Sequence, residues 1–199
     1  MADSAKNRHP IAIFLAAVVF LLGANAVWAQ PSVPLPPAVG LSDSQAAERA
    51  ALLKELAAAK SDAEARGIED RLWTFWRSFA DDQGRQLLEQ SKQAQLRFDY
   101  AEATLYLKEL VKHAPQFAEG WNQLAYVYFL AGDYEDSLAA IERVLALEPM
   151  HYAALAGKGI ILMQQGKAAD AQVPLKRALA IDPWLKERNL IGEDRIPEP

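Results

Sequence analysis

Three prolines recur at intervals of 34 residues, at Pro115, Pro149 and Pro183. When the sequence is written in rows of that length, other columns fall into register, among them Gly132 with Gly166. A fixed internal period of this size indicates small supersecondary units that stack side by side and share a continuous core. We therefore predict a repeat protein that acts by presenting a surface.

The rows span residues 84–117, 118–151 and 152–185, and each is predicted to form a helix A, a tight turn and a helix B. Long runs of Ala, Leu, Glu and Lys favour helix throughout, so no sheet is expected. The first row departs from the pattern, because Phe98 stands where the other rows carry glycine. An outer unit meets a different neighbour from the inner ones, which accounts for such a departure.

Small residues and caps mark the same places in successive rows. Ala125 and Gly159 occupy equivalent columns, where two helix axes are expected to approach closely. Gly132 and Gly166 are predicted to end helix A, because a left-handed backbone costs glycine nothing. The residues expected to cap helix B are Asp99 and Asp133.

The middle row reads AEGWNQLAYVYFLAGDYEDSLAAIERVLALEPMH, and the next row shares its glycine, alanine and proline columns. With these features, residues 84–185 resemble the tetratricopeptide repeat family. The resemblance implies an all-α fold, an α-solenoid of helix-turn-helix repeats, with a concave groove lined by helix A side chains that point away from helix B. The residues that it places in this groove are Lys92, Gln95, Glu119, Asn122, Tyr126, Phe129, Ala156, Ile160, Met163 and Gln164.

Tyr126 and Phe129 are the main candidates in this groove, because exposed aromatic side chains give a large contact area at a low entropic cost. The alternative for these aromatic residues and for Ile160 is packing within the stack. Some members of the family grip an acidic carboxyl terminus with basic groups, which are absent from the corresponding positions here. Those positions are Leu88, Gln123, Ala153 and Gly157. We therefore expect a partner that supplies a helix or an extended peptide.

Residues 42–83 are predicted to form a helical hairpin ahead of the repeats. Ser42 with Gln45, and Ser61 with Glu64, have the spacing of capping boxes that begin two helices. The apolar stripe of the second helix consists of Ile68, Leu72, Phe75, Trp76 and Phe79. We expect this hairpin to pack on the first repeat.

Trp73 falls at the edge of that stripe and is a second candidate binding surface. The alternative is burial under the preceding helix. The surrounding residues, ARGIEDRLWTFWRSF, together with the repeats behind them, resemble exported tetratricopeptide repeat proteins of Gram-negative bacteria, and of alphaproteobacteria in particular.

Residues 1–29 divide as a secretory signal peptide does. Basic residues precede the uncharged apolar run from Ile11 to Leu22, and Ala29 ends a motif that a signal peptidase reads. Cleavage would leave Gln30 as the first mature residue, in the periplasm of a bacterium. The alternative is an uncleaved signal that anchors the chain in the inner membrane.

The segments that flank the helical region are expected to be irregular. Residues 30–41 read as a Pro-rich linker, and residues 186–199 as a short capping segment with a frayed tail.

Composition excludes several classes of function. The net charge of −5 disfavours nucleic acid as a partner. Without cysteine the chain has no disulfide, no thiolate metal site and no lipid attachment point. His113 and His151 have no recognisable catalytic partner in the sequence, so we expect neither an enzyme nor a cofactor or metal.

These observations favour a non-enzymatic scaffold or adaptor of the bacterial cell envelope, which binds a protein or peptide and is not inserted in the membrane after signal cleavage. One alternative is a small-ligand or glycan-binding accessory to an envelope-building enzyme. Another is a structural subunit that associates with copies of itself.

Overall fold

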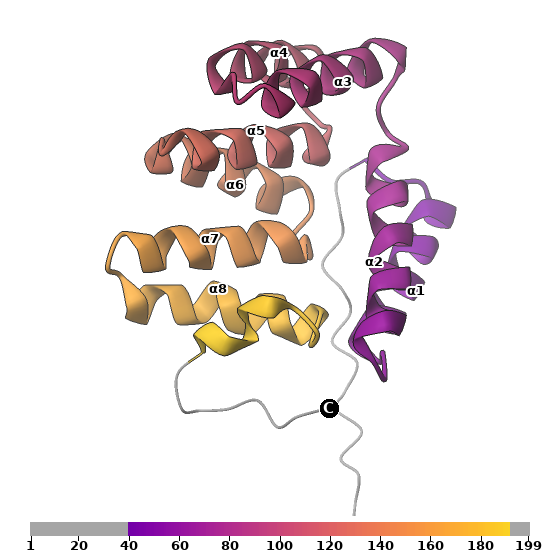
Figure 1. Ribbon diagram of the computed structural model, residues 1–199. Coiled ribbons are helices and arrows are strands. Elements are labelled where there is room, and N and C mark those ends of the chain that lie inside the picture. The colour runs from indigo at the N-terminus through magenta and orange to yellow at the C-terminus, as the bar shows by residue number, and fades with distance from the viewer. Residues whose placement is uncertain (1–39, 192–199) are drawn as a thin grey trace, which may run out of the picture. The chain divides into compact units, whose positions relative to one another are not determined.

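The computed structural model describes residues 40–191 (Figure 1). Within this range the chain forms eight α-helices and one short 3₁₀ helix, and no strand. They are α1 (Asp43–Ala57), α2 (Asp62–Arg77), α3 (Asp82–Leu96), α4 (Tyr100–His113), α5 (Ala118–Ala131), α6 (Tyr134–Leu147), α7 (Tyr152–Gln164), α8 (Ala168–Ile181) and η1 (Lys186–Leu190). The proposed signal with its cleavage site at Ala29–Gln30, most of the linker and residues 192–199 lie outside the described residues.

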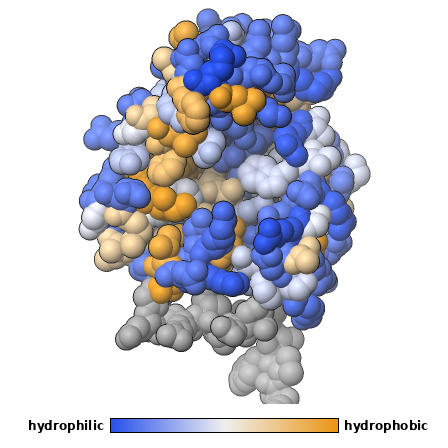
Figure 2. Space-filling view, viewed as in Figure 1, coloured by the Kyte–Doolittle hydropathy of each residue, from blue (hydrophilic) through white to orange (hydrophobic). Residues whose placement is uncertain are grey.

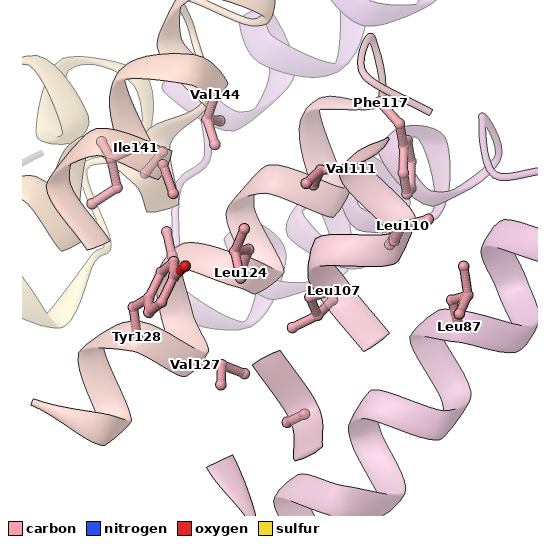
Figure 3. Packing of buried hydrophobic residues seen from close by; sticks show 14 of the residues in the cluster. Leu87, Leu107, Leu110, Val111, Phe117, Leu124, Val127, Tyr128, Ile141 and Val144 are labelled. Atoms are coloured by element: carbon pink, nitrogen blue, oxygen red, sulfur yellow. The ribbon is translucent and has the colours of Figure 1, made fainter. Parts of the chain in front are cut away.

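The predicted α-solenoid is confirmed by three consecutive helical hairpins, α3–α4, α5–α6 and α7–α8, which stack in chain order (Figure 1). Helices α4 and α6 each pack between the helix A of their own repeat and the helix A of the next repeat. In Figure 3, Leu107 and Leu110 of α4 lie between Leu87 of α3 and Leu124 of α5. Close packing of such apolar side chains is the main source of stability in stacked repeats.

The predicted ends of helix A are confirmed at Gly132 and Gly166, whose φ angles are 85° and 73°. In the first repeat Phe98 adopts the same left-handed conformation, with φ 59°. Asp99 caps α4 by accepting a hydrogen bond from the Glu102 amide at 2.9 Å. Asp133 occupies the N-cap position of α6 but makes no side-chain hydrogen bond there, so the predicted side-chain cap is wrong at this position.

The two small-residue positions lie where helix A and helix B of one repeat approach closely. The Ala125 carbonyl accepts a hydrogen bond from the Ser137 hydroxyl at 2.7 Å. A Cβ atom at Gly159 would lie 2.4 Å from Leu175 Cγ, so any larger side chain there would push α7 and α8 apart.

Capping residues begin both helices of the amino-terminal hairpin. Ser42 and Gln45 form a complete capping box at α1. At α2 the Ser61 hydroxyl accepts from the Glu64 amide at 3.2 Å, while the Glu64 carboxylate accepts from the amide of Lys60 instead of Ser61. None of the helices between residues 40 and 191 has the length and apolar character needed to cross a membrane.

The amino-terminal hairpin packs on the second and third repeats, so the predicted packing on the first repeat is wrong. In Figure 1, α1 and α2 run across the ends of α5 to α8. A second hydrophobic cluster joins Leu56 and Leu72 of the hairpin to Tyr152 and Leu155 of α7. The hairpin therefore forms a wall at the side of the stack, and α3–α4 remains the outer repeat.

Candidate binding groove

A groove of about 460 Å³ lies between α5, α7, the hairpin helix α2 and the segment that contains η1. Helix α5 contributes Asn122, Gln123, Ala125, Tyr126 and Phe129, and α6 contributes Ser137 and Ile141. Helix α7 contributes Tyr152, Ala153, Ala154, Ala156, Gly157, Ile160 and Ile161. The remaining lining residues are Glu69, Trp73, Leu185, Lys186 and Glu187. Side chains from both ends of the folded region thus meet in one groove.

One wall of the groove is apolar and partly open to solvent. Tyr126 is 51% exposed, whereas Phe129 and Ile160 are half-buried. The Phe129 ring packs on Tyr134, with 5.9 Å between the ring centroids. Figure 2 shows a band of hydrophobic surface across the repeats, bordered by hydrophilic residues. An exposed aromatic residue beside apolar neighbours is typical of a protein-binding surface.

The opposite end of the groove is polar and acidic. Glu69 and Tyr152 line it, and Asp182 lies behind them, fully buried at the end of α8. Burial, and then the negative charge of Asp182, raises the pKa of Glu69 to about 7. Burial also raises the pKa of Asp182 above its ordinary value. This end of the groove therefore disfavours the ionised form of its own carboxyl groups.

Two buried polar atoms at this end have few hydrogen-bond partners. The Tyr152 hydroxyl, in a side chain that is 2% exposed, has no partner with hydrogen-bond geometry among residues 40–191, although the Trp73 indole lies beside it. Asp182 Oδ1 accepts from the Trp184 amide at 3.0 Å, whereas the partner of the other side-chain oxygen is the Glu69 carboxyl group, which can donate only when it is protonated. Buried polar groups with so few partners are rare in folded proteins, and they often occur at functional sites.

An aromatic cluster fixes α2 against the stack. Trp76 stacks on His151, with ring centroids 4.1 Å apart and an interplanar angle of 14°. Trp73 contacts Trp76, His151 and Tyr152 edge-on, at centroid distances of 5.4, 5.6 and 6.1 Å. His151 also begins α7, because its Nδ1 accepts from the Ala154 amide at 3.3 Å. The position of Trp73 in the groove is thus set by tertiary contacts with the second and third repeats.

Glu119 was predicted to line the groove, and the structure places it below the groove surface, 1% exposed. Its carboxylate accepts hydrogen bonds from Asn122 Nδ2 at 3.0 Å and from Gln123 Nε2 at 2.6 Å. Its Oε2 also lies 3.5 Å from His151 Nε2. Glu119 therefore positions two groove amides, and it is not itself available to a partner.

The other predicted residues divide between the groove and its surroundings. Those that line the groove are Trp73, Asn122, Tyr126, Phe129, Ala156 and Ile160. Those outside its lining are Lys92 and Gln95 on α3, and Met163 and Gln164 at the end of α7. Trp73, predicted as a separate surface, belongs to the same groove as the repeat residues.

Glu69, Tyr152 and residues 185–187 were missed as groove residues. Helical periodicity assigns Glu69 to the polar face of its helix and Tyr152 to a repeat boundary. Only the packing of the hairpin on the second and third repeats brings them together. No local pattern in the sequence signals this contact, because Glu69 and Tyr152 are separated by more than two repeats' length of chain.

Neither candidate histidine belongs to a catalytic constellation within residues 40–191. His113 Nε2 lies 2.8 Å from Asp81 Oδ2, and Asp81 caps α3 through the Gly84 amide. That amide, and then His113, lowers the pKa of Asp81. His151 is fully buried in the aromatic cluster. No group of three potential metal-ligating side chains occurs in the same part of the chain.

Comparison with known proteins agrees with the fold. A sequence profile described as tetratricopeptide repeat matches residues 96–138 and 124–183. A TPR repeat-containing protein of Rhizobium etli is 41% identical over 61 residues, which make up 31% of this chain and 30% of that protein. The chain thus matches less than a third of the length of this curated relative.

Two solved structures show the same arrangement of helices. A MamA RS-1 ArsTM double mutant has a TM-score of 0.50 and 26% identity, over 52% of this chain and 58% of that chain. The TPR2B domain of yeast Sti1, solved in complex with pHsp70, has a TM-score of 0.51 and 17% identity. That match covers 55% of this chain and 91% of that domain.

Proposed function

This chain carries tetratricopeptide repeats over residues 96–183, and from this we propose that it is a non-enzymatic adaptor that binds a segment of a partner protein in the groove. The observation that carries the proposal is the groove itself, in which the half-exposed Tyr126 ring stands beside Phe129 and Ile160. A helix or an extended peptide can cover such a surface with a few apolar anchor residues. The Sti1 domain with pHsp70 supports a peptide as the class of ligand.

Two features of the groove prepare it for binding. Asn122 and Gln123 are held by the buried Glu119 carboxylate, so their amide groups are oriented before a partner arrives. Trp73 is held by three aromatic neighbours. A preorganised surface loses less side-chain entropy on binding, which increases affinity.

The location that we propose is the bacterial periplasm, on the basis of the signal-like residues 1–29. Mass spectrometry of the protein from its native host tests this. A mature chain that begins at Gln30 is the expected result, and an intact amino terminus in the membrane fraction would mean an inner-membrane anchor instead.

The binding proposal is tested by crosslinking in the native host, followed by purification of the wild type and of the double variant Asn122→Ala/Tyr126→Ala. The matched control is Leu105→Ala, because Leu105 is 68% exposed on α4 and does not line the groove. We expect a protein that copurifies with the wild type and the control and is lost from the double variant. Direct titration with that purified protein then confirms the interaction.

Identical sets of partners for all three proteins would overturn the proposal that the groove binds protein. Circular dichroism must show that the double variant folds. If only a small molecule accompanies the wild type, the ligand-binding alternative is favoured.

A further inference from the structure

The acidic end of the groove determines which kind of segment can bind there. Glu69 on α2 and Glu187 on η1 line the groove, and the fully buried Asp182 lies behind them, where its carboxylate shares a side-chain hydrogen bond with the Glu69 carboxyl group. The basic residue among the lining residues is Lys186, which is exposed on η1. The acidic groups at this end are therefore in excess.

The charges around Glu69 neutralise it only in part. The positive charge of Arg66, one turn earlier on α2, acts to lower the pKa of Glu69, but this side chain is exposed and pairs with Asp62. On the side of the stack, Glu69 faces Tyr152 and Asp182, and neither group supplies positive charge. Glu69 is half-buried and Asp182 is fully buried, so the two carboxylates together carry a desolvation cost that the nearby positive charge does not offset. A positive charge from outside the chain would remove this cost.

The two sides of the acidic end are held in fixed positions. Trp184 Nε1 donates to the Ala59 carbonyl at 3.1 Å, which joins the segment after α8 to the turn between α1 and α2. Asp182 is the C-cap of α8 and is held by the Trp184 amide. Glu69 lies on the helix that Trp76 fixes to His151. These contacts therefore fix the positions of Glu69 and Asp182 relative to each other.

We propose that the segment bound in the groove carries a Lys or Arg side chain that inserts beside Glu69 and Asp182, while adjacent apolar residues of the same segment lie on Tyr126, Phe129 and Ile160. The proposal rests on the function proposed above and narrows the partner to a basic amphipathic segment. Charge complementarity sets the position and orientation of such a segment. The apolar wall favours a protein segment over a small free cation, which would leave that wall uncovered.

The raised pKa of Glu69 agrees with this assignment, because the acidic end accepts a proton when no other cation is present. Binding of a Lys or Arg side chain would displace that proton. Affinity is therefore expected to fall as the pH is lowered from 7.5 to 5.5, since Glu69 must then lose its proton before the cation binds.

The test is selection of random 12-residue peptides displayed on phage, against the full chain and three variants. Glu69→Gln removes the charge at the acidic end, and Tyr126→Ala removes the apolar anchor. Asp70→Asn is the matched control, because it removes one carboxylate from the next position of α2, on the exposed side and outside the groove lining. We expect the wild type and Asp70→Asn to enrich peptides with a Lys or Arg at a fixed spacing from apolar residues.

Fluorescence anisotropy with the most enriched peptide gives the second readout. Replacing its basic residue by Met, or replacing Glu69 by Gln, should each weaken binding at least about tenfold, as expected for a charge-assisted hydrogen bond. The two changes together should weaken it hardly further, because they remove the same interaction. Tyr126→Ala should weaken binding of the enriched peptide and also of the version in which Met replaces the basic residue.

The outcomes separate the two proposals. Peptides that require Tyr126 but show no basic residue, or that bind Glu69→Gln as well as wild type, would overturn the basic-segment inference and leave the groove function standing. No enriched peptide, or enrichment that survives Tyr126→Ala, would overturn both. Stabilisation by free spermidine that depends on Glu69, without any peptide binding, would identify a free-cation site and also overturn the inference.

Discussion

Arg49 and Glu148, which are 99 residues apart in the chain, form a buried bidentate ion pair. Arg49 Nε lies 2.5 Å from Glu148 Oε2, and each residue is only 3% exposed. The pair joins α1 to the C-cap of α6, and Glu148 Oε1 also accepts from the Met150 amide at 3.1 Å. It therefore ties the amino-terminal hairpin to the turn that precedes α7.

Replacing Arg49 by Met is expected to lower the free energy of unfolding by about 3–5 kcal/mol, because Glu148 remains buried without a cation. Chemical denaturation followed by circular dichroism measures this. Limited proteolysis should also show cleavage between α2 and α3, since the hairpin is released from the stack.

Arg71→Met is the control for Arg49→Met. Arg71 pairs with Glu55 at 2.6 Å, but both side chains are about half exposed, so its loss should cost less than about 1 kcal/mol. The double variant Arg49→Met/Glu148→Met should recover much of the lost stability. Equal effects of Arg49→Met and Arg71→Met would show that the buried pair does not hold the hairpin.

Replacing Phe98 by Gly is expected to raise the free energy of unfolding by about 1–2 kcal/mol. Phe98 is held at φ 59° and is 78% exposed, so it bears the strain of the left-handed conformation and loses little packing when removed. The reverse change, Gly132→Ala, should lower the free energy of unfolding by a similar amount, because alanine is strained at a φ of 85°. No atom lies within 4 Å of the new Cβ position, so this backbone strain is the cause of the effect. Thermal unfolding of both variants checks this, and a stabilising Gly132→Ala would contradict it.

Replacing Gly159 by Ala is expected to lower the free energy of unfolding by about 1–3 kcal/mol, because the added Cβ would lie 2.4 Å from Leu175 Cγ. Gly67→Ala is the matched control inside another helix. Nothing lies within 4 Å of its Cβ position, so the change should stabilise α2 by about 0.5–1 kcal/mol. Denaturation midpoints that move in opposite directions confirm the prediction, and a neutral Gly159→Ala would refute it.

The stability of the junction between α2 and α8 should decrease as the pH rises from about 4.5 to about 7. The folded-state pKa of Glu69 is raised to about 7 from an ordinary value of 4.5, so in this window the folded chain binds more protons than the unfolded chain. The free energy of unfolding therefore falls with rising pH. Burial of Asp182 acts in the same direction.

Glu69→Gln should flatten this pH dependence and raise stability at pH 7.5. Asp70→Asn on the same helix should leave the slope unchanged. Denaturation midpoints at several pH values between 4.5 and 8 provide the measurement. If Glu69→Gln retained the wild-type slope, another group would be responsible for it.

Much of the fold could be predicted because its determinants are local. Gly132 and Gly166 end their helices by their own backbone freedom, and Asp99 and Ser42 cap helices within a few residues of their own positions. The 34-residue period repeats such signals, so errors at single positions do not alter the architecture. The missing side-chain cap at Asp133 shows that a suitable residue type does not guarantee the hydrogen bond.

The candidate groove could be predicted only where it follows the helix period. Tyr126 and Ile160 were placed by the resemblance, as residues on the side of helix A that faces away from helix B. Glu119 has the same helical phase as Asn122 and Tyr126, but its position at the start of α5 brings it under His151, where it is buried. Helical periodicity predicts which side of a helix a residue lies on, but it does not predict which other elements pack over the end of that helix.

By itself, the sequence determined the helices, their turns and the stacking of three repeats, because these depend on backbone preferences and on contacts between neighbouring units. Only the tertiary structure decided where the amino-terminal hairpin packs, because that depends on pairs such as Arg49 with Glu148 and Trp76 with His151, which are distant in the chain. That packing brings Glu69 beside Asp182 and closes one end of the groove. The chemistry of the acidic end therefore arises from contacts across long sequence separations, which no local pattern encodes.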